Sequence, residues 1–387
     1  MALAAMAKSV PLSEDNWGSP VSYLLVKLAA RCNLNCTYCY WFKDPDVYRR
    51  AAVMGDRTAA ALVKRIREQI ELHRLDQFKI LFHGGEPLLF KASRFDQLLA
   101  DLVGVGRETG CSFDFSITTN GVLLDQKWVD VLRRYRVNTT ISIDGPSNVH
   151  DRRRIDLRGR PTHGQVVEAI NLLDREQLPF GLLAVCDPQS SSAEVVDYFV
   201  DQLGVRKFNI LIPDAKHGDN PVSIAKYFKA LFEYVYSVRG DDRIRVTLLS
   251  NMIRGLLGGG LRTESIGIGP INTVTVLTDG ELQALDVTRI AGDGFTRSSL
   301  NIHRNAIEEI KTDPLWQELY LAGTNHHPKC QACTWYNVCG AGHVSTRWSN
   351  ENRYRNVSVY CDDFQEIYSH LWDRVCSRLT AVEAAAS

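Results

Sequence analysis

Short apolar segments alternate with longer amphipathic ones through the first part of this chain. Six β-rich runs are candidate strands, at residues 21–28, 78–82, 113–118, 139–143, 180–185 and 207–212. Amphipathic helical patterns follow them at residues 58–73, 95–109, 126–135, 164–176, 193–203 and 224–236. Repeats of strand and helix predict an α/β fold with a parallel sheet, closed or half-closed into a barrel.

Polar and glycine-rich segments follow the first four predicted strands. They are residues 32–39, 83–87, 119–121 and 144–146. In a barrel of parallel strands, chemistry is located on the loops after the carboxyl ends of the strands. The sequence therefore predicts that these four segments meet at one rim and form the functional site.

Composition excludes several classes of protein. Lys+Arg and Asp+Glu both number 45 in 387 residues, so charge favours neither nucleic acid nor an anionic membrane as a partner. The first residues carry too short an apolar stretch for a signal peptide, and no apolar run is long enough to span a membrane. We expect a cytoplasmic enzyme.

Seven of the ten cysteines fall in two closely spaced groups, which indicates metal binding rather than disulfides. The first group is Cys32, Cys36 and Cys39, with spacing C-x3-C-x2-C. Closely spaced thiolates hold iron–sulfur clusters. Three thiolates leave one iron of a 4Fe–4S cluster open to bind a substrate or cofactor, and the alternative is a zinc site or a coincidence.

With Tyr38 and Tyr40 flanking the third cysteine, this spacing resembles the signature of the radical S-adenosylmethionine (SAM) superfamily. The resemblance implies a partial (β/α)6 TIM-like barrel and SAM bound to the open iron. It also implies that one electron from the cluster cleaves SAM to a 5′-deoxyadenosyl radical, since SAM and Fe–S centres carry radical chemistry.

Further motifs occur in the order that this family has them. Gly84-Gly85-Glu86-Pro87 resembles its GGEP motif, in which glycines allow close approach to a ligand and Glu86 accepts from the SAM amino group. Arg154, twelve residues after Ser142, is expected to hold the SAM carboxylate with its two-pronged donor group. The resemblance implies further SAM contacts from Tyr38, Thr119, Asn120, Asp144 and Val185.

The second cysteine group lies near the carboxyl end, at Cys330, Cys333, Cys339 and Cys361. Four thiolates form a closed site for a 4Fe–4S cluster or a structural zinc ion. The spacing resembles the SPASM extension of radical SAM peptide maturases. His343 and Leu285 stand where the full SPASM pattern has further cysteines, so we expect one auxiliary cluster, with His343 structural or an additional ligand.

The sequence of residues 272–287 predicts a β-hairpin, because two β-rich runs flank the turn Thr278-Asp279-Gly280. Asp286 lies in its second strand. In related sulfatase-maturing enzymes an aspartate at this place is thought to take a proton from the substrate, as a carboxylate general base does. The alternative is an aspartate on the surface of a hairpin.

The reduced cysteine tail resembles those of maturases that form a carbon–carbon crosslink, or cyclophane, in a ribosomally made precursor peptide. When the crosslinked ring regains aromaticity it loses a proton and an electron. Asp286 would take that proton, and the auxiliary cluster would take that electron. The alternatives are a thioether or ether crosslink, epimerisation, formylglycine formation in a sulfatase, or a scaffold protein without catalysis.

The expected organisation is an N-terminal segment at 1–20, the barrel at 21–238, a bridging region at 239–325 and a SPASM-like tail at 326–387 closed by a helix at 364–378. The implied partners are a precursor peptide and a reducing electron donor such as flavodoxin or ferredoxin. Neither nucleic acid nor a membrane is expected as a partner.

Overall fold

A computed structural model describes residues 17–260, 265–292 and 294–386 of the chain, with side chains up to residue 378. Most of the predicted segment 1–20 therefore lies outside the described residues. None of the helices in these ranges is long and apolar enough to cross a membrane.

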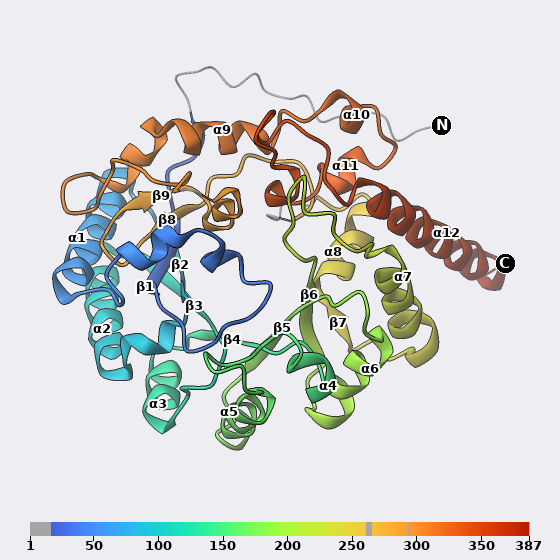
Figure 1. The fold of residues 1–387 in the computed structure, drawn as a ribbon, viewed down its shortest axis with the longest axis horizontal. Helices are drawn as coiled ribbons and strands as arrows, with labels where there is room; N and C mark the ends of the chain where they lie inside the picture. Colours follow the sequence, from blue (N-terminus) through green and yellow to red (C-terminus); the bar gives the residue numbers. More distant parts are fainter. Residues whose placement is uncertain (1–16, 261–264, 293, 387) are drawn as a thin grey trace.

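Parallel strands form an arc, and helices surround it on the outside (Figure 1). The sheet has the order β7-β6-β5-β4-β3-β2-β1-β8-β9, so β1 to β7 lie side by side in sequence order and β8 and β9 extend the sheet beyond β1. This confirms the α/β prediction. The strands are β1 Tyr23–Ala29, β2 Gln77–Gly84, β3 Ser112–Thr119, β4 Asn138–Ser142, β5 Phe180–Val185, β6 Lys207–Leu211, β7 Arg245–Val246, β8 Val274–Val276 and β9 Leu282–Gln283.

The helices cover the outer face of the sheet with apolar side chains and include all six segments that the sequence predicts. Two of these, α6 and α7, continue as π-helical turns at Tyr198–Gln202 and Tyr234–Arg239. The α-helices are α1 Asp56–His73, α2 Ala92–Thr109, α3 Gln126–Arg134, α4 Ser147–His150, α5 His163–Arg175, α6 Ser192–Asp197, α7 Ala225–Glu233, α8 Thr247–Leu256, α9 Pro314–Ala322, α10 Pro328–Gln331, α11 Tyr336–Cys339 and α12 Cys361–Ala386.

The hairpin predicted at 272–287 forms, but its strands are shorter than predicted, and one of them also pairs with a strand of the barrel. Its turn is as expected, because Gly280 has φ +85° and donates its N–H to the Leu277 carbonyl at 2.9 Å. Strand β8 also pairs in parallel with β1, which adds the hairpin to the edge of the barrel sheet.

The prediction that the second strand extends to Val287 is wrong. A 3-10 turn, η6, occupies Asp286–Ala291 instead. A strand would direct successive side chains to opposite faces, whereas Asp286, Val287, Thr288, Arg289 and Ile290 are all buried. The turn brings Asp286 under the barrel rim, so it is not a surface hairpin aspartate.

Gly84 and Gly85 pack against the backbone at the end of β1. A Cβ atom on Gly85 would lie 2.3 Å from the Arg31 carbonyl oxygen, and one on Gly84 would lie 2.5 Å from that of Ala29. The Gly85 N–H also donates to the Ala29 carbonyl at 2.7 Å, and the Glu86 N–H donates to the Arg31 carbonyl at 2.8 Å. The two glycines thus let this loop pack directly against the strand that leads into the cysteine segment.

We expect Gly85→Ala to destabilise the protein by about 1–3 kcal/mol, because backbone must move to make room for the methyl group. Gly104 in α2 is the matched control, since a Cβ atom there meets nothing within 4 Å. Gly104→Ala should raise stability by about 0.5–1 kcal/mol through helix propensity. Anaerobic urea unfolding of both variants checks this, and equal stability of the two would contradict it.

Candidate functional site

The loops after β1 to β6 enclose one cavity at the carboxyl ends of the strands. It measures about 180 Å³. Most residues that the sequence predicts for the first cluster and for SAM line it, namely Cys32, Cys36, Tyr38, Cys39, Gly84, Gly85, Glu86, Thr119, Asn120, Ser142, Arg154 and Val185.

The three cysteines lie on the loop between β1 and a 3-10 turn at Tyr40–Lys43. Two backbone hydrogen bonds fix this loop against the segment after α4, from Asn35 N to Ile155 O at 2.7 Å and from Thr37 N to Arg153 O at 2.9 Å. Burial raises the pKa of the Cys36 thiol to about 11 and also raises that of Cys39. Thiols held this way ionise readily only when they bind a metal, as iron–sulfur ligation requires.

Glu86 connects three loops of the rim. Its buried carboxylate accepts from the Thr119 hydroxyl at 2.6 Å, from the Asn120 amide N–H at 2.9 Å and from the Leu88 N–H at 2.9 Å. Burial raises the pKa of Glu86 to about 7, although these three donors oppose the shift. A carboxylate has about four acceptor sites, so one remains for the ammonium group that the sequence assigns to it.

Arg154 faces the cavity, and its two neighbours in the basic run do not. Arg152 pairs with Asp187 and is half exposed, and Arg153 donates to the Cys186 carbonyl at 2.9 Å. Arg154 is buried and its Nε lies 3.1 Å from Asp144 Oδ1. Asp144 faces the Nε side of the guanidinium, which leaves the Nη atoms available for a second carboxylate.

Asp144 does not line the cavity. It accepts from the Tyr38 hydroxyl at 2.8 Å and from the Val185 N–H at 3.0 Å. Burial alone would raise the pKa of Asp144, but the Arg154 charge and these donors lower it below its usual range. Asp144 therefore holds Tyr38 and Arg154 in place, and a direct SAM contact from it stays a prediction.

A buried polar network beneath the cysteine loop contains residues that the sequence did not point to. Lys27 on β1 is fully buried and forms an ion pair with Asp286. Its Nζ also lies 3.2 Å from His83 Nδ1 on β2 and 4.3 Å from the Trp41 ring. The composition of β1 offered a signal, since Lys27 interrupts an otherwise apolar strand.

Asp286 accepts hydrogen bonds from Lys27 and from the Tyr40 hydroxyl. Burial alone would raise the pKa of Asp286, but Lys27, His83 and Tyr40 bring it down to about 2. An efficient general base has a pKa near the working pH. The role of Asp286 as a base stays a prediction, and its geometry is that of a buried counter-ion.

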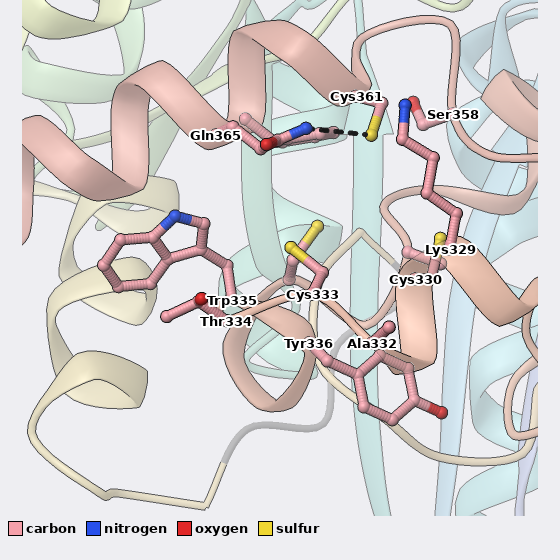
Figure 2. A pocket seen from close by; sticks show the side chains of 13 residues that line it. Lys329, Cys330, Ala332, Cys333, Thr334, Trp335, Tyr336, Ser358, Cys361 and Gln365 are labelled. Atoms are coloured by element: carbon pink, nitrogen blue, oxygen red, sulfur yellow. Dashed lines mark hydrogen bonds between the residues drawn. The ribbon is translucent and has the colours of Figure 1, made fainter.

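The four tail cysteines line a second cavity of about 330 Å³ between α10, α11 and the start of α12. Figure 2 shows the sulfur atoms of Cys330, Cys333 and Cys361 facing a common space. Gln365, one turn along α12, donates to Cys361 Sγ at 3.6 Å. Burial and the three neighbouring thiols together raise the pKa of Cys339 to about 12.

A buried arginine supports an anionic group in this second cavity. Arg347 is 2% exposed and donates to the Ala322 carbonyl at 2.8 Å, and its Nε has no hydrogen-bond partner in the described part of the chain. Burial lowers the pKa of Arg347 to about 10, while Cys330 and Cys339 oppose that shift. A cluster with four thiolates would supply the negative charge that this buried cation lacks.

Four thiolates suit either a zinc ion, which holds all four sulfurs at about 2.3 Å, or a 4Fe–4S cluster, in which each thiolate binds a different iron. The assignment of an auxiliary cluster to these four cysteines stays a prediction.

Residues 26–201 match the radical SAM superfamily. The chain carries a radical SAM domain. As predicted from the cysteine spacing, this radical SAM enzyme uses SAM and a 4Fe–4S cluster, and Cys32, Cys36 and Cys39 are the residues that would hold that cluster.

Relatives extend the similarity over the tail. The cysteine-type anaerobic sulfatase-maturating enzyme of Clostridium perfringens is 24% identical over 376 residues, which cover 92% of this chain and 97% of the relative. The serine-type enzyme of Klebsiella aerogenes is 31% identical over 209 residues, 52% of this chain and 49% of the relative. Native anSMEcpe with bound AdoMet has a similar fold, with a TM-score of 0.76 at 22% identity over 92% of this radical SAM enzyme and 98% of that chain.

Two positions expected to carry cysteines in the full SPASM pattern are filled differently. Leu285 is buried in the hydrophobic core. His343 lies 2.9 Å from the Ser345 hydroxyl and 3.4 Å from Asp214, measured from Nδ1. The radical SAM enzyme thus has core packing and a polar contact at the two places where a further cluster would have its ligands.

Cys333→Ser should reduce the iron of the reconstituted protein from about eight to about four atoms per chain, because only the four-thiolate site loses a ligand. SAM cleavage at the three-thiolate site should persist. Cys376→Ser is the control, since Cys376 lines neither cavity. Iron analysis and a 5′-deoxyadenosine assay measure both effects, and full iron content in Cys333→Ser would contradict the second cluster.

Lys27→Met should cost about 3–5 kcal/mol of stability at neutral pH, because it leaves the buried Asp286 carboxylate without its cation. Adding Asp286→Asn should restore part of the loss, since the neutral amide needs no counter-ion. Urea unfolding of the single and double variants gives the coupling energy. Additive losses would show that the pair has no such dependence.

Proposed function

We propose that this radical SAM enzyme oxidises one residue of a peptide substrate by two electrons. The observation that carries the proposal is the presence of two different cysteine sites in one chain. The site that would leave an iron open suits SAM, and the closed four-cysteine site suits an acceptor of one electron. An oxidation that removes one hydrogen atom, one proton and one electron needs both.

The peptide and the product are inferred from the relatives. Alignment with a cysteine-type sulfatase-maturating enzyme spans barrel and tail alike, and one neighbouring structure is that of anSMEcpe with a bound peptide. We therefore propose formylglycine as the first candidate product, made from cysteine or serine in a sulfatase segment. Both types of relative match this chain.

The chain's own residues supply binding and exclusion of water. When bound, SAM and the reduced cluster provide a radical that abstracts hydrogen. Arg154 offers its guanidinium to the SAM carboxylate, and Glu86 offers its remaining acceptor site to the ammonium group. Leu183, Val185 and Ile212 give the cavity an apolar wall, which keeps water from the radical.

A carbon–carbon crosslink is the second candidate. Its support is the reduced tail, in which Leu285 and His343 replace two expected cysteines. Crosslinking needs the same loss of two hydrogens, so the same two sites serve it. The prediction that Asp286 accepts the proton stays untested.

The test is anaerobic turnover of the fully loaded enzyme with SAM and dithionite. The substrates are a sulfatase peptide with cysteine at the target position, its serine counterpart and any short peptide encoded beside this gene. Formylglycine from cysteine loses sulfur and two hydrogens and gains oxygen; from serine it loses two hydrogens. Both products react with a hydrazide probe, whereas a crosslink loses two hydrogens and gives no aldehyde.

We expect one 5′-deoxyadenosine per oxidised peptide and none from a Cys36→Ala control. Aldehyde supports the first candidate and a crosslinked fragment pattern the second. 5′-Deoxyadenosine with every peptide unchanged in mass would contradict the proposed oxidation.

A further inference from the structure

Asp214 is a carboxylate at the cavity that no sequence motif indicated. It lies just after β6 and lines the cavity together with the cysteine loop. Glu86 is the other carboxylate in that lining, and its oxygens already accept from three donors. The Asp214 side chain is 21% exposed, whereas Glu86 is 1% exposed, so Asp214 is the more accessible of the two carboxylates.

The tail holds Asp214 by one oxygen only. The Ser345 hydroxyl donates to Oδ1 at 2.6 Å, and His343 Nδ1 lies 3.4 Å from the same oxygen. Oδ2 accepts no hydrogen bond from the residues that the structure describes. A carboxylate fixed through one oxygen and free at the other is placed to accept a proton.

The loop that carries Asp214 is itself attached to the tail. The His217 N–H donates to the Trp348 carbonyl at 2.9 Å, and the His217 ring nitrogen Nε2 lies 2.9 Å from the Val357 carbonyl oxygen. The segment between two auxiliary-site cysteines, Cys339 and Cys361, therefore fixes the position of a carboxylate at the mouth of the radical site.

We propose that Asp214 is the general base of the oxidation, with Ser345 and His343 as its positioning residues; this rests on the proposed function. For a cysteine or serine substrate, one hydrogen atom leaves the β-carbon for the radical that bound SAM supplies. The S–H or O–H proton passes to Asp214 Oδ2. The auxiliary 4Fe–4S cluster that the four tail cysteines would hold would accept the remaining electron, and a C=S or C=O double bond would form. Water then converts C=S to the aldehyde and releases hydrogen sulfide.

Asp286 is the competing carboxylate, and its surroundings differ. It is buried against Lys27 and Tyr40 and does not line the cavity. A proton from the cavity reaches it only through intermediate groups, either the Tyr40 hydroxyl or His83 and Lys27. Asp214 needs no such intermediate group, and His343 beside it gives the proton a route onward toward solvent, since its side chain is 20% exposed.

The experiment compares Asp214→Asn with the wild type on whichever peptide the wild type oxidises. We expect the rate of product formation to fall about 10²–10⁴-fold, as for loss of a general base, while 5′-deoxyadenosine continues to form. Peptide affinity, measured by fluorescence anisotropy without reductant, should stay within about threefold, because the loss lies in the chemical step. Iron content should not change.

Two further variants separate catalysis from structure. Ser345→Ala keeps the carboxylate but removes its donor, and should lower the product rate about tenfold. Asp219→Asn changes a carboxylate of the same loop that caps a turn at Lys216 N and does not line the cavity. It should leave the product rate unchanged.

Wild-type product rates in Asp214→Asn would overturn the inference while leaving the proposed function intact. Product loss matched by equal loss of peptide affinity or of iron would also overturn it, because the role would then be structural. If the wild type oxidises none of the peptides, the proposed function fails and the inference fails with it.

Discussion

The buried ion pair between Lys27 and Asp286 joins the parts of this protein that make up its site. Lys27 comes from the first barrel strand and Asp286 from the turn after the added hairpin. Burying two charges is costly unless geometry and further hydrogen bonds compensate. Here Tyr40, His83 and the Trp41 ring surround the pair, so the cysteine loop, the second strand and the hairpin share one polar centre beneath the radical site.

The tail has two roles in this arrangement. Its cysteines form the second site, and the segment between Cys339 and Cys361 also fixes the loop after β6 through Ser345 and Trp348. Loss of the auxiliary site should therefore disturb the mouth of the first cavity as well. This coupling gives a physical reason why barrel and tail occur in one chain, since the carboxylate that we propose as the base is held from the tail.

The sequence predicts the fold well because strand–helix alternation and polar loop motifs are local signals. The first three cysteines and the GGEP-like loop likewise line one cavity, and the four tail cysteines line a second one. The sequence motif predicts that the glycines allow close approach to a ligand. In the structure, Gly84 and Gly85 also make room for the backbone at Ala29 and Arg31. Lys27 and Asp214 escaped prediction because their roles depend on contacts across strands and from the tail, which no local spacing reveals.

The central claim is that the two cysteine sites hold two clusters and that only the first binds SAM. Electron paramagnetic resonance of the reduced, fully loaded protein, recorded before and after addition of SAM, tests it most directly. The account predicts two overlapping signals, one of which changes with SAM while the other does not. A single signal, or two signals that SAM leaves unchanged, would contradict it.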